Sequence, residues 1–87
     1  MKDKPPLTLP ELKNGTFGRI IKITGSQQAL KRLSALGLVP GKKIMKISGI
    51  PLSGPVIVDI DRTQVALGFG LAKKVLVEVC DENSLGR

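Results

Sequence analysis

The sequence has no histidine, tryptophan or tyrosine, only two phenylalanines and a single cysteine, Cys80. Without histidine, the most frequent general base and metal-ligating side chain is missing, and Cys80 has no imidazole to activate it as a nucleophile. A lone cysteine also excludes an internal disulfide and a clamp of two thiols on a metal ion. We therefore expect a protein that is not an enzyme and that holds no cofactor.

Long apolar runs are also missing, since none approaches the roughly 20 residues that a membrane-spanning helix needs. Residues 1–6 carry charge and proline with no apolar segment behind them, so we expect no secretory signal there. A single thiol suits a reducing compartment. These features favour a cytoplasmic protein that reaches a membrane only through a partner.

Acidic residues are few, with 7 Asp and Glu against 14 Lys and Arg, and the formal net charge is +7. An excess of this sign favours an acidic partner: nucleic acid, an anionic membrane surface or an acidic protein face. The basic residues are scattered along the chain, so a merely soluble surface explains them at least as well. Phe17 and Phe69 are too few for a platform that stacks bases.

The clearest structural signal is the run 33–41, Leu-Ser-Ala-Leu-Gly-Leu-Val-Pro-Gly. The apolar residues at helical spacing here and just before it are Ala29, Leu30, Leu33 and Leu36. They predict a helix over about 26–36 that covers a core with one stripe. Gly37 suits the left-handed position after the helix, and Leu38 the next position, which folds back on the last turn. Pro40-Gly41 then predicts a type II turn.

Five segments rich in β-branched residues predict short strands, at residues 16–23, 42–48, 56–60, 64–67 and 75–79. Short helical turns are expected at 8–13, where Thr8 and Glu11 form a capping box, and at 71–74, after a flexible break at 68–70. Ile20 and Ile23 can share a face only if the first strand bulges or bends between them.

Together these elements predict a mainly β fold in one domain over residues 7–80, with flexible tails at 1–6 and 81–87. Five short strands joined by turns, with one inserted helix, indicate a small barrel of strongly bent antiparallel strands.

The spacing of Arg32-Leu33, Leu36-Gly37-Leu38 and Pro40-Gly41 resembles the signature of the FeoA family, small proteins associated with bacterial and archaeal ferrous iron uptake. The similarity extends over about residues 9–79 and includes the loop Pro51-Leu52-Ser53-Gly54-Pro55, in which Ser53 is an extra residue against the more compact variants. This resemblance implies an SH3-like barrel and carries over no catalytic residue.

The resemblance also implies a function: a cytoplasmic accessory or regulatory protein that contacts FeoB, the GTPase-bearing iron permease. The alternative is a basic small barrel that works as a regulatory module, like the C-terminal domain of metal-dependent repressors, or that binds nucleic acid weakly. No specific nucleic acid is expected, and self-association is left open.

Candidate contact residues are the apolar side chains at element ends and loop tips. They are Leu36, Leu38, Pro51, Leu52, Pro55 and Phe69. We expect loop 49–55 to approach the helix end, with Leu52 as an anchor; the competing interpretation is that these residues only cap the core. Asp59 and Asp61 could share a strand face and are weak candidates for a hard cation, although a solvated face explains them better.

Overall fold

The computed structural model describes residues 6–80, so most of both predicted tails lies outside the described residues. In chain order the elements are β1 (Leu7–Thr8), the 3-10 turn η1 (Leu9–Glu11), β2 (Phe17–Ile23), α1 (Gln27–Ala35), β3 (Lys43–Ser48), β4 (Val56–Ile60), β5 (Thr63–Leu67), α2 (Phe69–Ala72) and β6 (Val75–Cys80). All strands belong to one antiparallel sheet in the order β1-β6-β2-β3-β4-β5.

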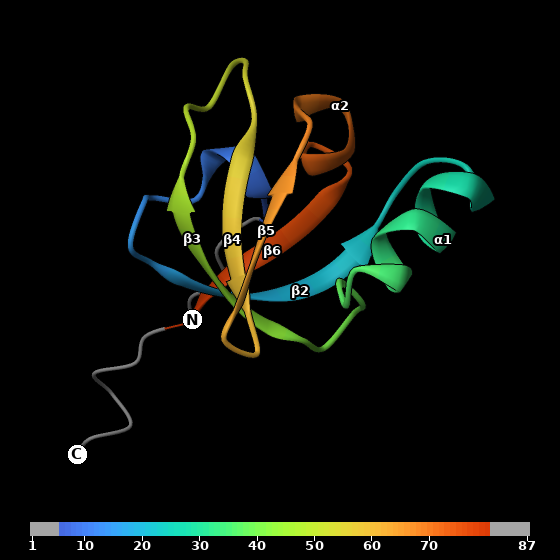
Figure 1. The fold of residues 1–87 in the computed structure, drawn as a ribbon, viewed down its shortest axis with the longest axis horizontal. Helices are drawn as coiled ribbons and strands as arrows, with labels where there is room; N and C mark the ends of the chain where they lie inside the picture. The colour runs from blue at the N-terminus through green and yellow to red at the C-terminus, as the bar shows by residue number, and fades with distance from the viewer. Residues whose placement is uncertain (1–5, 81–87) are drawn as a thin grey trace.

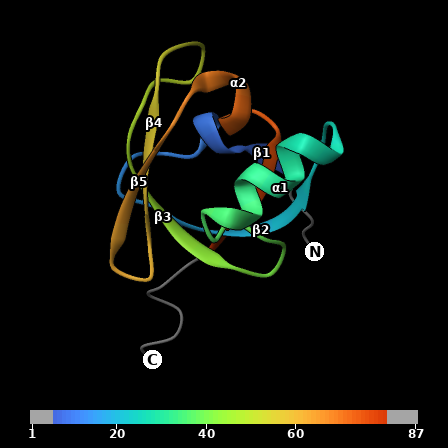
Figure 2. The same cartoon turned by 45° about the vertical axis from the view of Figure 1, so that its right-hand side comes forward.

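The sheet curls around its own core, as Figures 1 and 2 show from two directions. The helix α1 lies at one side, beside the end of β2, while α2 lies at the same end of the molecule as the β3–β4 loop (Figure 1). The predicted mainly β barrel is thus confirmed. The sixth strand, β1, was missed because two residues are too short for any periodicity.

Every strand except β1 supplies fully or almost fully buried side chains to one core. Its members are Leu9, Leu12, Ile20, Ile23, Leu33, Leu38, Ile44, Val56, Val58, Ile60, Leu67, Ala72, Val75 and Val77. The register of β2 against β6 shifts between Ile20 and Lys22, so Ile21 is the extra residue of a bulge. This bulge lets Ile20 and Ile23 both face the core, as their spacing required.

The start and end of α1 follow the sequence signals. The Ser26 hydroxyl accepts from the Ala29 N–H at 3.2 Å and caps the helix. At the other end, Gly37 has φ +94° and donates to the Ser34 carbonyl at 2.9 Å, while Leu38 donates to the Leu33 carbonyl at 2.9 Å. These two bonds make a Schellman motif, which confirms the predicted end of the helix.

The turn after the helix is also confirmed. Gly41 has φ +92°, and the Lys42 N–H donates to the Val39 carbonyl at 3.1 Å, as expected with Pro40 and Gly41 at the corners of a type II turn. The chain reverses here and enters β3.

The predicted stripe of α1 is only half correct. Ala29 and Leu33 are buried, but Leu30 and Leu36 keep 39% and 41% of their surface exposed. Residues four apart lie one above the other on a helix, so a narrow line of contact buries this pair and leaves the flanking leucines outside. The helix therefore carries apolar surface that its own sheet does not cover.

The short helical turns differ in how well they were predicted. In η1 the Thr8 N–H donates to the Glu11 carboxylate at 2.8 Å, in agreement with the capping box. The turn α2, by contrast, begins at Phe69, with the Ala72 N–H donating to the Gly68 carbonyl at 2.9 Å. The expected flexible break at 68–70 is wrong, because burial of Ala72 outweighs the weak helix propensity of glycine.

Candidate functional site

The loop of residues 49–55 carries the most exposed apolar side chain of the described residues: Leu52, 85% exposed. Pro51 and Pro55 are exposed beside it. The base of the loop is narrow, because a Cβ at Gly49 would lie 3.1 Å from the Pro55 carbonyl oxygen and from the Val56 Cα. Two prolines and a pinched base hold an apolar tip away from the barrel.

The position of this loop corrects one expectation. In both cartoons the loop lies near α2 and away from the C-terminal end of α1 (Figures 1 and 2). It does not approach the helix end, because the curl of the sheet brings the β3–β4 connection to the other end of the barrel. Phe69, at the start of α2, is half-buried, and the Lys73 ammonium lies 5.8 Å from its ring centroid.

Leu36 and Leu38 have opposite environments. Leu38 has no exposed surface and packs in the core, so the expectation that it lies at the surface is wrong. The Schellman motif explains this, since it folds the residue after Gly37 back on the last helical turn. Leu36 remains exposed and lines a cleft.

This cleft of about 350 Å³ lies between the C-terminal half of α1 and the junction of β5 with α2. Its lining residues are Arg32, Ala35, Leu36, Ala66, Leu67, Gly68 and Leu71. Only Leu36 was among the predicted contact residues. The others escaped notice because they come from two segments about 30 residues apart, and no local pattern indicates that these segments meet. We name this feature the α1–β5 cleft.

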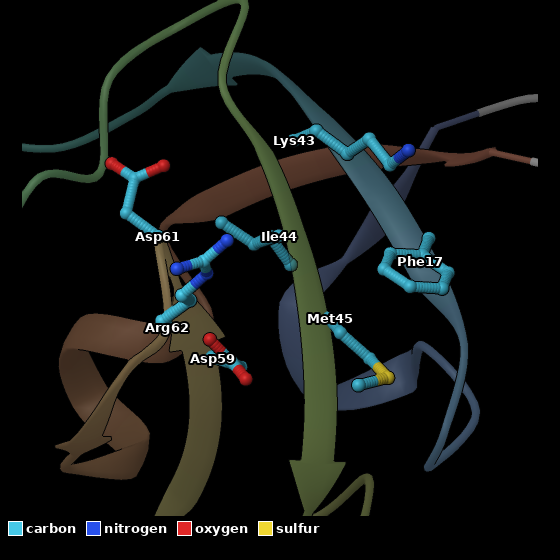
Figure 3. A pocket seen from close by; sticks show the side chains of 7 residues that line it. All are labelled: Phe17, Lys43, Ile44, Met45, Asp59, Asp61 and Arg62. Carbon is cyan, nitrogen blue, oxygen red and sulfur yellow. The ribbon is translucent and has the colours of Figure 1, made fainter.

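A second, smaller pocket of about 280 Å³ lies on the outer face of the sheet (Figure 3). It is lined by Phe17, Lys43, Ile44, Met45, Asp59, Asp61 and Arg62. The strand register sets Phe17 opposite Met45 and Met45 opposite Asp59, so these three side chains form a row across β2, β3 and β4. The Lys43 ammonium lies 4.9 Å from the Phe17 ring centroid, in cation–π contact.

The two weak metal candidates line this pocket but do not converge. Asp61 has φ +52° in the turn after β4, and its carboxylate pairs with the Lys42 ammonium at 2.5 Å. Figure 3 shows the carboxylate of Asp61 directed away from Asp59. The shared strand face is not formed because the strand ends at Ile60. Within residues 6–80, no group of three or more acidic, histidine or cysteine side chains is placed to hold a metal ion.

One functional-group position that sequence reasoning missed is a buried lysine on β3. Lys46 on β3 is 1% exposed, and its ammonium donates to the Pro10 carbonyl at 2.6 Å and to the Leu12 carbonyl at 2.8 Å. Desolvation in the core lowers the pKa of Lys46 below its ordinary value. Its apolar neighbours Met45 and Ile47 suggest a solvent-facing position, but the alternation of β3 puts Lys46 on the same face as buried Ile44. The carbonyls of Pro10 and Leu12 then serve as its hydrogen-bond partners.

The fold and these surfaces define a class: a small SH3-like barrel whose most prominent features are an apolar loop tip, a cleft beside one sheet edge and a second, smaller pocket. The chain belongs to the FeoA domain family, whose sequence model matches residues 7–79. This family is linked to Fe²⁺ transport. Over the described residues, no helix is both long and apolar enough to cross a membrane.

Two relatives support this membership. The chain is 35% identical over 66 residues to a Fe(2+) transport protein A of Methanocaldococcus jannaschii, with 76% of this chain and 78% of that protein covered. It is 32% identical to the crystal structure of an iron uptake regulatory protein, FeoA, with a TM-score of 0.80 over 87% of this chain and all of the other.

A third structure shares the fold alone. A manganese-dependent transcriptional repressor is 21% identical, with a TM-score of 0.79 over 91% of this chain and 44% of the repressor. The barrel therefore also occurs as part of longer regulatory proteins.

Proposed function

We propose that the protein is a cytoplasmic accessory factor of ferrous iron uptake that acts by contact with the cytoplasmic region of an FeoB-type iron permease. Membership of a family linked to Fe²⁺ transport supports the process. The main support for this mode of action is the exposure of Leu52, a large apolar side chain that is 85% exposed at a loop tip. An exposed leucine contributes little to folding stability, whereas it can contribute to a partner's affinity.

The loop suits docking because its backbone is already restricted and has little conformational freedom left to lose when a partner binds. Pro51 and Pro55 each fix one backbone angle, and the close passage of Gly49 over Val56 fixes the base. A segment that is already ordered loses less conformational entropy when it binds, so more of the contact energy appears as affinity. The net charge of +7 favours an acidic face on the partner.

The test compares Leu52→Glu with the parent protein for binding to the isolated cytoplasmic region of the permease. We expect affinity to fall about tenfold or more, which corresponds to about 1.4 kcal/mol, while the melting temperature stays nearly unchanged. Ile21→Glu is the matched control, since Ile21 is an exposed apolar residue in the bulge of β2, a different strand from β3 and β4, which the loop joins. It should bind as the parent does.

Leu33→Glu provides the reference for a damaged core, because Leu33 has no exposed surface and the variant should unfold. If Leu52→Glu destabilises the fold about as much, the loop is a plug of the core and the proposed contact surface must be abandoned.

A second candidate function is a regulatory module that binds nucleic acid, favoured by the fold likeness to the manganese-dependent repressor and by the basic charge. A protein that neutralises several phosphates loses affinity for duplex DNA with a log–log salt slope of about −0.9 per phosphate. We expect only weak binding that disappears near physiological salt. Tight, sequence-selective binding at that salt would favour this second function over the first.

A further inference from the structure

Among residues 6–80, the strand β5 forms an edge of the sheet, since there it pairs only with β4 in the strand order. Its five residues, Thr63–Leu67, carry no charge and no proline, and their register with β4 runs without a shift. Proteins usually protect an edge strand with lysine, proline, a bulge or very short length. The opposite edge, β1, has only two residues and is protected in that way. The edge at β5 has none of these devices.

The register identifies which groups of β5 face outward. Thr63 pairs with Ile60 across a two-residue turn in which both Asp61 and Arg62 have positive φ, as in a type I′ hairpin. The pair that closes such a hairpin is hydrogen-bonded, and bonded and non-bonded pairs alternate along the ladder. Gln64 and Ala66 therefore direct their N–H and C=O groups away from β4. Within residues 6–80, β5 has no second partner strand.

The α1–β5 cleft continues this edge. Ala66, Leu67 and Gly68 belong to one wall, and Arg32, Ala35 and Leu36 of α1 and its cap form the other. A strand that paired with Gln64 and Ala66 would carry alternate side chains toward this cleft, where the exposed part of Leu36 offers apolar contact. Among the described residues that line the cleft, Arg32 is the single charged one. The cleft thus favours an apolar side chain with an acidic one close by.

We infer that the β5 edge and the α1–β5 cleft form a strand-addition site for an extended segment of a protein partner in which acidic and apolar residues alternate. Main-chain hydrogen bonds to an exposed edge supply affinity in such sites, and pockets for alternate side chains supply specificity. A second copy of this chain fits less well, because each copy carries a net charge of +7 and β5 offers no acid to Arg32. The inference deepens the proposed function by naming a surface and the kind of segment that it takes.

The test uses a synthetic probe, the peptide acetyl-Glu-Val-Glu-Val-Glu-Val-amide, added to the isotope-labelled full chain. We expect the amides of Gln64 and Ala66 to shift in the NMR spectrum and to exchange with solvent several-fold more slowly as they become hydrogen-bonded. The matched control peptide has lysine in place of each glutamate, so it keeps the strand propensity and reverses the charge. It should bind about tenfold more weakly or worse.

Ala66→Pro removes one outward N–H without removing a hydrogen bond to β4, because proline is tolerated on an edge strand when its nitrogen faces outward. The variant should keep its melting temperature within a few degrees and lose peptide affinity by about tenfold or more. If it fails to fold, Leu36→Glu on the opposite wall takes its place. A negative charge there should lower the affinity for the acidic probe by a similar factor, because it repels the glutamates that lie beside Arg32.

Three results would overturn the inference. The first is no change in the amide signals of Gln64 and Ala66 with the probe at millimolar concentration, and the second is unchanged affinity for the probe in a folded Ala66→Pro or Leu36→Glu variant. The third is hydrogen-exchange protection of β5 that rises with protein concentration alone, which would make a second copy the occupant. Binding to the permease region is measured separately. If that region does not bind at all, the proposed function fails while the peptide titration still decides the strand-addition site.

Discussion

The buried lysine allows the sharpest test of the fold. Replacing Lys46 with methionine keeps most of the volume of the side chain and removes the ammonium that donates to the Pro10 and Leu12 carbonyls. A buried acceptor left without a donor costs about 1–3 kcal/mol, so two of them cost about 2–6 kcal/mol. Part of this is offset because the variant no longer has to desolvate a charge. We expect a net loss of about 2–4 kcal/mol in the free energy of unfolding.

Thermal and urea unfolding would measure this loss. In a chain of this size 1 kcal/mol moves the melting temperature by about 4–8 °C, so a loss of about 2–4 kcal/mol should lower it by about 8–32 °C. Lys31→Met on the exposed face of α1 is the matched control, and it should change the free energy of unfolding by less than about 0.5 kcal/mol. Equal stability of Lys46→Met and the parent, or an equal loss in Lys31→Met, would refute the argument.

The pH dependence follows from the lowered pKa of Lys46. Between that lowered pKa and the ordinary value of 10.5, the folded protein binds fewer protons at this group than the unfolded chain does. The free energy of unfolding then rises with pH in this window. The neutral amine still has two N–H groups for its two carbonyl partners. The stability gap between the parent and Lys46→Met should therefore widen as pH rises toward 10.5, and a gap that narrows would contradict the lowered pKa.

Two further predictions concern the helix end and metal ions. Gly37→Ala should lower the free energy of unfolding by about 1 kcal/mol or more, because the residue has φ +94°. Ser34→Ala on the exposed helix face is its control in a thermal melt. Equal shifts in melting temperature for the two variants would show that the left-handed conformation of Gly37 does not determine the loss of stability. The isolated protein should bind Fe(II) or Zn(II) no more tightly than a generic acidic surface, since Asp61 is paired with Lys42 and directed away from Asp59. A stoichiometric, submicromolar calorimetric isotherm would contradict this.

Local signals were the predictable part of the fold. The end of α1 and the turn after it each depend on residues within five positions of one another, and Gly37 and Gly41 both have the positive φ that their roles require. The strand β4 has its predicted bounds, because Val56, Val58 and Ile60 alternate with partly exposed residues. Such features are decided by backbone sterics and by the two-residue period of a strand, and both can be read along the chain.

The candidate site was less predictable because its parts meet only in the folded chain. Leu52 was identified from the glycines and prolines around it, which is local information. The α1–β5 cleft joins residues of α1 to the end of β5, and its open edge depends on which strand finishes the sheet. Neither property leaves a periodic pattern in the sequence. The same limit explains why the loop was expected beside the wrong helix.

The N-terminal segment 7–12 shows how such long-range contacts act together. β1 pairs with β6, the carbonyl of Leu12 accepts from Lys46, and a Cβ at Gly18 would lie 3.0 Å from the Leu12 side chain. A strand of two residues and a single 3-10 turn have little stability of their own, so these contacts from β2, β3 and β6 must hold the segment in place. Because Leu9 and Leu12 are both buried, the segment closes one side of the core. The barrel thus protects its β1 edge with a short strand fixed by the core, whereas β5, the longer edge strand, is paired on one side only among residues 6–80.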